Sequence, residues 1–122
     1  MPKLQIVSQS EMPEHLKWQI LSFFRMEWPD GASGDDKYRD WLARADRHLV
    51  GVVVSHATLL ISFAAVVWKI LEHAGQSYKV YGLSGVFTYP SFRQQGYGAQ
   101  VVTAARDYID QTDGDLVIFT SG

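Results

Sequence analysis

The chain has 122 residues, 47% of them hydrophobic and 13% aromatic, which suffices for one compact domain and is too short for two. Its 13 acidic and 11 basic side chains give a net charge of −2, which disfavours a protein that binds nucleic acid by neutralising phosphates. The lack of cysteine excludes disulfides, cysteine-ligated metals and a cysteine nucleophile. The apolar runs are too short for a membrane span and the N-terminus lacks a signal-peptide core, so we expect a cytoplasmic protein with no membrane partner.

The first third of the chain predicts a strand, two helices and a loop. Residues 3–9 alternate in polarity, which is typical of a short strand. Helix-start signals at Ser10, Pro13 and Glu14 then precede apolar residues at helical spacing. Residues 28–36 are rich in Gly, Asp and Pro and predict a loop.

A second short helix is expected over residues 35–46. Its apolar positions Tyr38, Trp41 and Leu42 are expected to face inward.

The pattern changes to strands from His48 onward. The β-branched and aromatic runs 48–55, 58–71 and 77–88 are separated by short turns and predict an antiparallel meander. A loop, a helix ending near Asp110 and an apolar strand over 116–121 follow, and this strand–helix–strand order predicts a right-handed crossover. The fold class is therefore α/β (α+β): a mixed, mostly antiparallel sheet flanked by helices, with a β-α-β crossover.

The loop between the third strand of the meander and the next helix carries the informative motif, Arg93-Gln94-Gln95-Gly96-Tyr97-Gly98-Ala99. Glycines at a loop-to-helix junction let the backbone approach a ligand, and the first-turn N–H groups suit a pyrophosphate. A P-loop is excluded because the chain has no Gly-Lys pair. A dinucleotide fingerprint fits poorly, because Val101 stands where its third glycine belongs.

At these residues the sequence resembles the GNAT superfamily of acetyl-CoA-dependent N-acetyltransferases, whose signature is Q/R-x-x-G-x-G/A at the start of a helix. Arg93, Gly96 and Gly98 match this signature, and the resemblance covers roughly residues 48–120. It implies a single GNAT-like domain over residues 1–122 that lacks the family's usual C-terminal strands and helix.

The resemblance implies acetyl-CoA as the cofactor and assigns its contacts. The strand 116–120 would diverge from 85–88 to open the cleft, and a backbone N–H near Phe87 would polarise the thioester carbonyl. The implied pantetheine contacts are the backbones of Val86, Phe87 and Thr88, and the implied pyrophosphate contacts are Arg93, Gln94, Gln95, Gly96, Tyr97, Gly98 and Ala99.

Family members let the amine attack acetyl-CoA directly, which leaves the protein to position the amine and to move protons. Ser84 stands where many members carry a carboxylate, so it is the candidate catalytic residue, as a base that relays the proton through water. The family's usual acid is a tyrosine beyond the last strand, for which this chain has no counterpart.

The acceptor is expected to be a small-molecule amine. The sequence is more weakly similar to aminoglycoside 2′-N-acetyltransferases, and its acidic loop could attract a cationic amine. The candidate acceptor-binding residues are Asp35, Asp36, Ser84 and Thr120. The alternative for each aspartate is a solvated loop with a helix cap. The histidines lack the spacing of a metal site, so no metal is expected.

Two other interpretations stand beside the enzyme. One is a truncated, non-catalytic acetyl-CoA-binding domain that serves as a sensor or assembly module, and the other is a fragment of a longer enzyme. The last strand would lie at the sheet edge, so we also expect a homodimer formed through it.

Overall fold

The computed structural model describes residues 1–32, 34–43, 47–112, 114 and 116–119. Its strands and α-helices are β1 (Lys3–Ser8), α1 (Glu14–Glu27), β2 (His48–His56), β3 (Leu59–His73), β4 (Gln76–Thr88), α2 (Tyr97–Asp110) and β5 (Leu116–Phe119). Single 3-10 turns lie at η1 (Gln9–Glu11), η2 (Pro29–Ala32), η3 (Gly34–Tyr38) and η4 (Pro90–Phe92).

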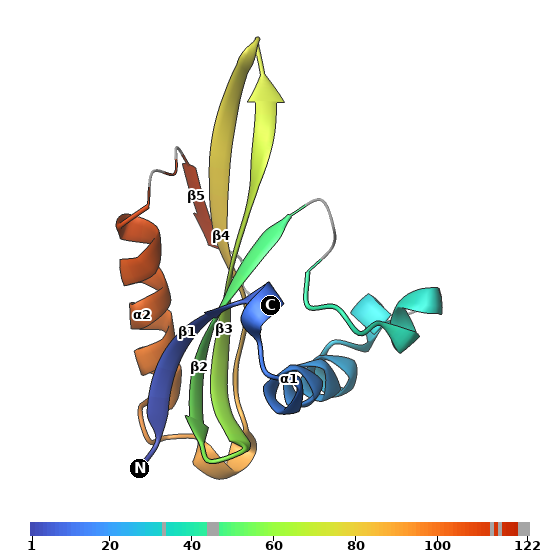
Figure 1. The fold of residues 1–122 in the computed structure, drawn as a ribbon, viewed down its shortest axis with the longest axis vertical. Helices are drawn as coiled ribbons and strands as arrows, with labels where there is room; N and C mark the ends of the chain where they lie inside the picture. Colours follow the sequence, from blue (N-terminus) through green and yellow to red (C-terminus); the bar gives the residue numbers. More distant parts are fainter. Residues whose placement is uncertain (33, 44–46, 113, 115, 120–122) are drawn as a thin grey trace.

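The strands form one five-stranded sheet in the order β1-β2-β3-β4-β5 (Figure 1). The first four strands pair antiparallel with their neighbours, and β5 pairs parallel with β4 after the crossover through α2. The mixed, mostly antiparallel sheet expected from the sequence is therefore confirmed.

Helices cover opposite faces of this sheet (Figure 1). Side chains alternate between the faces along each strand, so Val53, Phe63 and Ala65 pack with α1, whereas Val52 and Val66 pack with α2. β2 begins opposite Trp68, and β3 continues beyond that point beside β4 in a hairpin that projects past the rest of the sheet (Figure 1).

The expected helix over residues 35–46 is wrong. Only η3 is helical, residues 39–43 are irregular, and residues 44–46 lie outside the described chain. Leu42 is buried as expected, but Tyr38 is 78% exposed.

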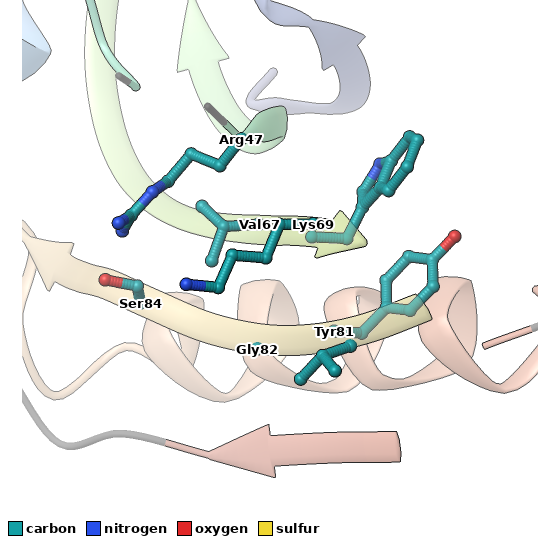
Figure 2. A pocket seen from close by; sticks show the side chains of 8 residues that line it. Arg47, Val67, Lys69, Tyr81, Gly82 and Ser84 are labelled. Carbon is teal, nitrogen blue, oxygen red and sulfur yellow. The ribbon is translucent and has the colours of Figure 1, made fainter. Parts of the chain in front are cut away.

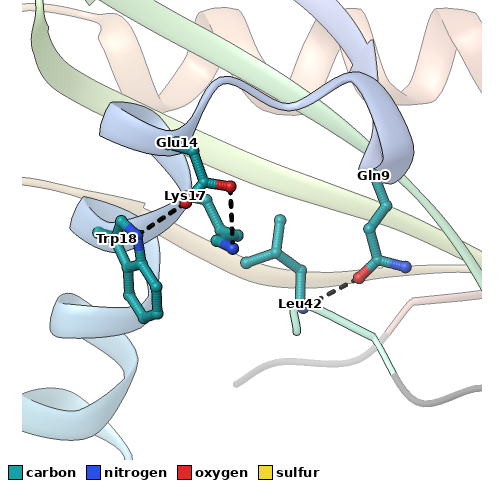
Figure 3. Close-up of polar contacts among 5 residues, drawn as sticks. All are labelled: Gln9, Glu14, Lys17, Trp18 and Leu42. Atoms are coloured by element: carbon teal, nitrogen blue, oxygen red, sulfur yellow. Dashed lines mark hydrogen bonds and ion pairs between the residues drawn. The ribbon is translucent and has the colours of Figure 1, made fainter. Parts of the chain in front are cut away.

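Side chains from other elements bind the backbone groups that this helix would have used. Gln9 Oε1 accepts a hydrogen bond from the N–H group of Leu42 at 2.9 Å (Figure 3). It also accepts one from the N–H group of Ala43 at 2.6 Å. Arg25 on α1 donates to the carbonyls of Lys37 and Arg39 at 3.1 and 2.8 Å. Tertiary contacts thus override the local helical pattern.

Candidate functional site

The connection from β4 to α2 holds the glycine-containing loop that the sequence analysis singled out. Arg93 follows η4, and α2 begins at Tyr97 with Gly96 as its N-cap. Gln94 (φ 64°) and Gly96 (φ 87°) adopt the left-handed backbone conformation. A non-glycine residue held there costs about 1–3 kcal/mol, and such residues cluster at ligand-binding loops. Where left-handed residues alternate with right-handed ones, successive backbone N–H groups point into one concavity that can bind an anion.

The backbone N–H groups of this loop are available to a ligand. Within the described chain, the N–H groups of residues 94–99 donate to no protein acceptor, and no side chain caps α2. Because the helix dipole adds positive potential, the start of α2 is electropositive. Gly98 leaves the approach open, since even a Cβ there would lie 3.4 Å from Thr88 Oγ1. The loop thus presents a row of donors suited to a phosphate or pyrophosphate.

The end of β4 anchors Arg93 next to these donors. Its Nε donates to the Thr88 carbonyl at 3.1 Å, which uses one of the five N–H donors of the guanidinium. Thr88 is fixed in turn by the buried Ser62, whose hydroxyl lies 2.8 Å from Thr88 Oγ1 and donates to the Phe87 carbonyl at 2.9 Å. The side chain of Arg93 is therefore held across the base of the loop.

A bulge interrupts β4 just before this end. On β3 a single residue separates two paired positions, whereas on β4 both Gly85 and Val86 separate Ser84 from Phe87. Gly85 has a φ of 61°, which is typical of the glycine in such a bulge. Bulges re-aim the side chains on either side, so Ser84 and Phe87 serve different cavities.

Beyond the bulge lies a cavity of about 360 Å³, here called the α1–β4 pocket. The ring of Phe23 stacks on that of Phe87 with centroids 4.0 Å apart, which fixes one of its walls. Its lining residues are Phe23, Glu27 and Trp28 near the end of α1, and Val86, Phe87, Thr88 and Arg93 at the end of β4. Through Arg93 the pocket adjoins the row of N–H donors.

Before the bulge lie two adjoining pockets of about 200 Å³ each, here called the β3–β4 groove. Arg47, Val67 and Ser84 line both of them. One pocket extends to Lys69 (Figure 2), and the other extends to Arg39. Gly85 lines the groove and the next residue, Val86, lines the α1–β4 pocket, so the two cavities adjoin at the bulge.

β5 accompanies β4 only as far as the bulge. Its residues Leu116–Phe119 pair with Val80 to Leu83. Within the described chain, residues 84–88 of β4 therefore have no strand neighbour on that side. This register is consistent with the expected opening between 116–120 and 85–88, although Thr120 itself lies outside the described residues.

The described residues contain no group of three or more histidines and carboxylates that could hold a metal ion. No described helix is long and apolar enough to cross a membrane. Burial raises the pKa of the Tyr89 hydroxyl, which donates to the Gln19 carbonyl at 2.7 Å. Tyr89 thus stays a neutral donor that ties α1 to the end of β4.

Residues 4–120 match the Acetyltransferase (GNAT) family. The chain belongs to this family. The resemblance inferred from Arg93, Gly96 and Gly98 is thereby confirmed, and so is the enzyme class, a GNAT acetyltransferase.

Solved structures similar to this GNAT domain include a predicted acetyltransferase from Clostridium acetobutylicum with acetyl-CoA, at a TM-score of 0.67 and 12% identity over 100% of this chain and 82% of that one. The aminoglycoside N-acetyltransferase AAC(6')-Iy in complex with CoA has a TM-score of 0.62 and 21% identity over 100% of this chain and 79% of that one. A transcriptional regulator from Bacillus halodurans C-125 has a TM-score of 0.63 and 16% identity over 98% of this chain and 83% of that one. At these identities the likeness shows the fold. A search of curated proteins finds no match.

Of the predicted acceptor residues that the structure describes, only Ser84 lines a cavity at the bulge. Ser84 lies in the β3–β4 groove, across the bulge from Val86. Asp35 and Asp36 lie in η3 and line neither the groove nor the α1–β4 pocket.

Sequence reasoning missed the basic side chains of the groove, Arg39, Arg47 and Lys69, and the carboxylate of Glu27. Lys69 had a usable signal: it is charged, yet its alternation with Val67 in an apolar strand places it on the α1 face. No local pattern marks the other three, because tertiary packing alone brings them to the cavities.

Proposed function

We propose that this GNAT domain transfers the acetyl group of acetyl-CoA to the primary amine of a small molecule. The observation that carries the proposal is the row of N–H donors at residues 94–99 beside the α1–β4 pocket. These donors would bind the pyrophosphate, and Arg93 would add a charge-assisted contact. The pantetheine arm would lie along residues 86–88 of β4, where no described strand competes for the backbone.

Acetyl-CoA supplies the acetyl group as a thioester. The amine nitrogen forms a bond to the acetyl carbon, the carbon–sulfur bond breaks, and the proton lost by the amine ends on the sulfur of CoA. The chain would hold the amine in the β3–β4 groove so that it meets the thioester at the bulge. A backbone N–H near Phe87 would polarise the thioester carbonyl.

Two side chains are candidates for taking the proton of the amine. Ser84 lines the groove and would relay the proton through water, whereas Glu27 lines the adjoining α1–β4 pocket with a carboxylate. The pH profiles of kcat for Ser84→Ala and Glu27→Gln distinguish them. If Glu27 is the base, Glu27→Gln removes the acidic limb of the profile. If Ser84 relays the proton, Ser84→Ala lowers kcat and leaves the limb in place, because a serine hydroxyl does not titrate in this range.

Gly98→Glu tests the cofactor site. The variant adds a side chain and a negative charge where the pyrophosphate should lie, and Gly98 has no positive φ that would strain a larger residue. We expect acetyl-CoA affinity, measured by calorimetry, to fall by at least about tenfold, which corresponds to roughly 1.4 kcal/mol. Thr103→Glu is the matched control, because it adds the same charge to an exposed position further along α2. Equal affinities for the two variants would reject the cofactor site.

A second candidate function is acetyl-CoA binding without turnover, as in a sensor. The observation that favours it is the serine at position 84, since the described lining of the groove contains no carboxylate. Release of CoA thiol in the presence of amines decides between the two functions: saturable binding with no release for any amine would support the sensor.

A further inference from the structure

The β3–β4 groove has room for a small molecule. Its two pockets of about 200 Å³ each share Arg47, Val67 and Ser84, so they form one continuous surface on the α1 face of β3 and β4. It ends at Gly85, directly beside the α1–β4 pocket. A molecule in the groove would thus reach the bulge, where the proposed cofactor site begins.

The charged side chains in the described lining of the groove are all basic. Arg39, Arg47 and Lys69 line it, and its described lining contains no Asp or Glu. In Figure 2 the guanidinium of Arg47 and the ammonium of Lys69 extend toward the same end of the pocket as the hydroxyl of Ser84. Each of the three cations is half-buried, so their fields are less screened than those of exposed side chains.

Packing holds the cation at the other end of the groove in place. The Arg39 guanidinium lies 4.5 Å from the centroid of the Trp41 ring and 5.4 Å from that of Phe24. It also donates to the Leu42 carbonyl at 3.5 Å, and Gln9 fixes Leu42 in turn. The part of the positive wall that Arg39 forms is therefore held in place by packing.

We propose that the acceptor amine carries an anionic group, a carboxylate or a phosphate, that binds between Arg47 and Lys69 beside Ser84. The proposal rests on the proposed function and specifies its substrate class. A cationic groove attracts an anion and repels a polycation, so it selects against an aminoglycoside even though aminoglycoside acetyltransferases share the fold. Asp35 and Asp36, which could attract a cation, do not line the groove.

The test titrates the whole chain with four amines while following the amide resonances of Gly82, Ser84 and Gly85. L-leucine and L-leucinamide differ by one carboxylate, O-phosphoethanolamine presents a phosphate, and tobramycin is a polycation. We expect saturable shifts with leucine or phosphoethanolamine and affinities at least about tenfold weaker for leucinamide and tobramycin, as loss of a charge-assisted contact implies. The tighter of the two anionic amines identifies the anionic group.

Two lysine variants assign the effect to the groove. Lys69→Gln should lower the affinity for the anionic amine by about tenfold. Lys79→Gln is the matched control, because Lys79 lies on the opposite face of the same hairpin, 4.7 Å from the centroid of the Trp68 ring. Equal effects of the two variants, preferred binding of tobramycin or leucinamide, or no binding of either anionic amine would each overturn the proposal.

A separate acetyl-CoA titration distinguishes this proposal from the function on which it rests. If acetyl-CoA binds while neither anionic amine does, only the anion site is overturned. If an anionic amine binds while acetyl-CoA does not, the proposed function has failed and the anion site stands.

Discussion

At the scale of single residues, Gly85 decides how the two cavities meet. Its φ of 61° disfavours side chains, and a Cβ there would lie 3.0 Å from Phe24 Cζ and 3.3 Å from Phe24 Cε1. We expect Gly85→Ala to lower the free energy of unfolding by about 2–5 kcal/mol, the sum of a left-handed alanine and an overpacked ring. Urea unfolding measures this loss.

Gly75→Ala is the control for the backbone part of this loss. Gly75 has a φ of 79° in the turn between β3 and β4, and a Cβ there would have no neighbour within 4 Å. It should therefore cost about 1–2 kcal/mol, from the backbone alone. The packing argument for Gly85 is wrong if both variants lose the same stability.

Residues differ in how far sequence alone could place them. Arg93, Gly96 and Gly98 were predictable because a phosphate-binding loop is a local pattern at the start of one helix. Lys69 and Arg47 meet only when β3 and the segment before β2 pack over one face, so composition could not bring them together. The aspartates at 35 and 36 were visible as a cluster, but a cluster does not reveal which cavity its side chains line.

At the scale of elements, strands were more predictable than the segment between α1 and β2. Each strand of the meander has alternation or β-branched runs, which specify its type locally. The segment 34–43 depends on Gln9 and Arg25, which lie in η1 and α1 and bind its backbone. Such distant partners leave no periodic signal in the segment itself.

Tyr89 links α1 to the end of β4, and its pKa predicts how this link responds to pH. Burial raises the pKa of Tyr89 above 10, so above that pH the unfolded chain loses the proton first. The stability due to Tyr89 is thus complete below pH 10 and is lost as the pH rises toward the folded pKa. Tyr89→Phe should lower the free energy of unfolding by about 0.5–1.5 kcal/mol at neutral pH, through the lost bond to Gln19.

The difference in free energy of unfolding between wild type and Tyr89→Phe should become smaller as the pH passes 10, because only the wild type has this proton to lose. Denaturant unfolding at a series of pH values measures it. Tyr38→Phe, which removes an exposed hydroxyl, controls for general alkaline effects. A difference that stays constant through pH 10 would contradict the role assigned to burial.

At the scale of the whole molecule, the sheet ends in an edge at β5. Among the described strands, β5 has a neighbour only on its β4 side, and β1 forms the other edge. An edge strand presents unpaired N–H and C=O groups that a second chain can extend. We therefore expect two copies to associate through β5 in a symmetric pair as concentration rises. Sedimentation velocity across a wide concentration range measures this association.

Hydrogen exchange then identifies which edge forms the contact. Amides of β5 should gain protection at concentrations where the dimer forms, whereas those of β1 serve as an internal control and should exchange at an unchanged rate. β1 is the other edge of the sheet, and its side chains Leu4 and Ile6 are 40% and 47% exposed. Protection of the β1 amides would therefore indicate a dimer contact through β1 and not through β5. A monomer at every concentration would refute association altogether. Protection confined to β1 would leave the dimer but place its interface at the opposite edge of the sheet from β5 and from the proposed acetyl-CoA cleft.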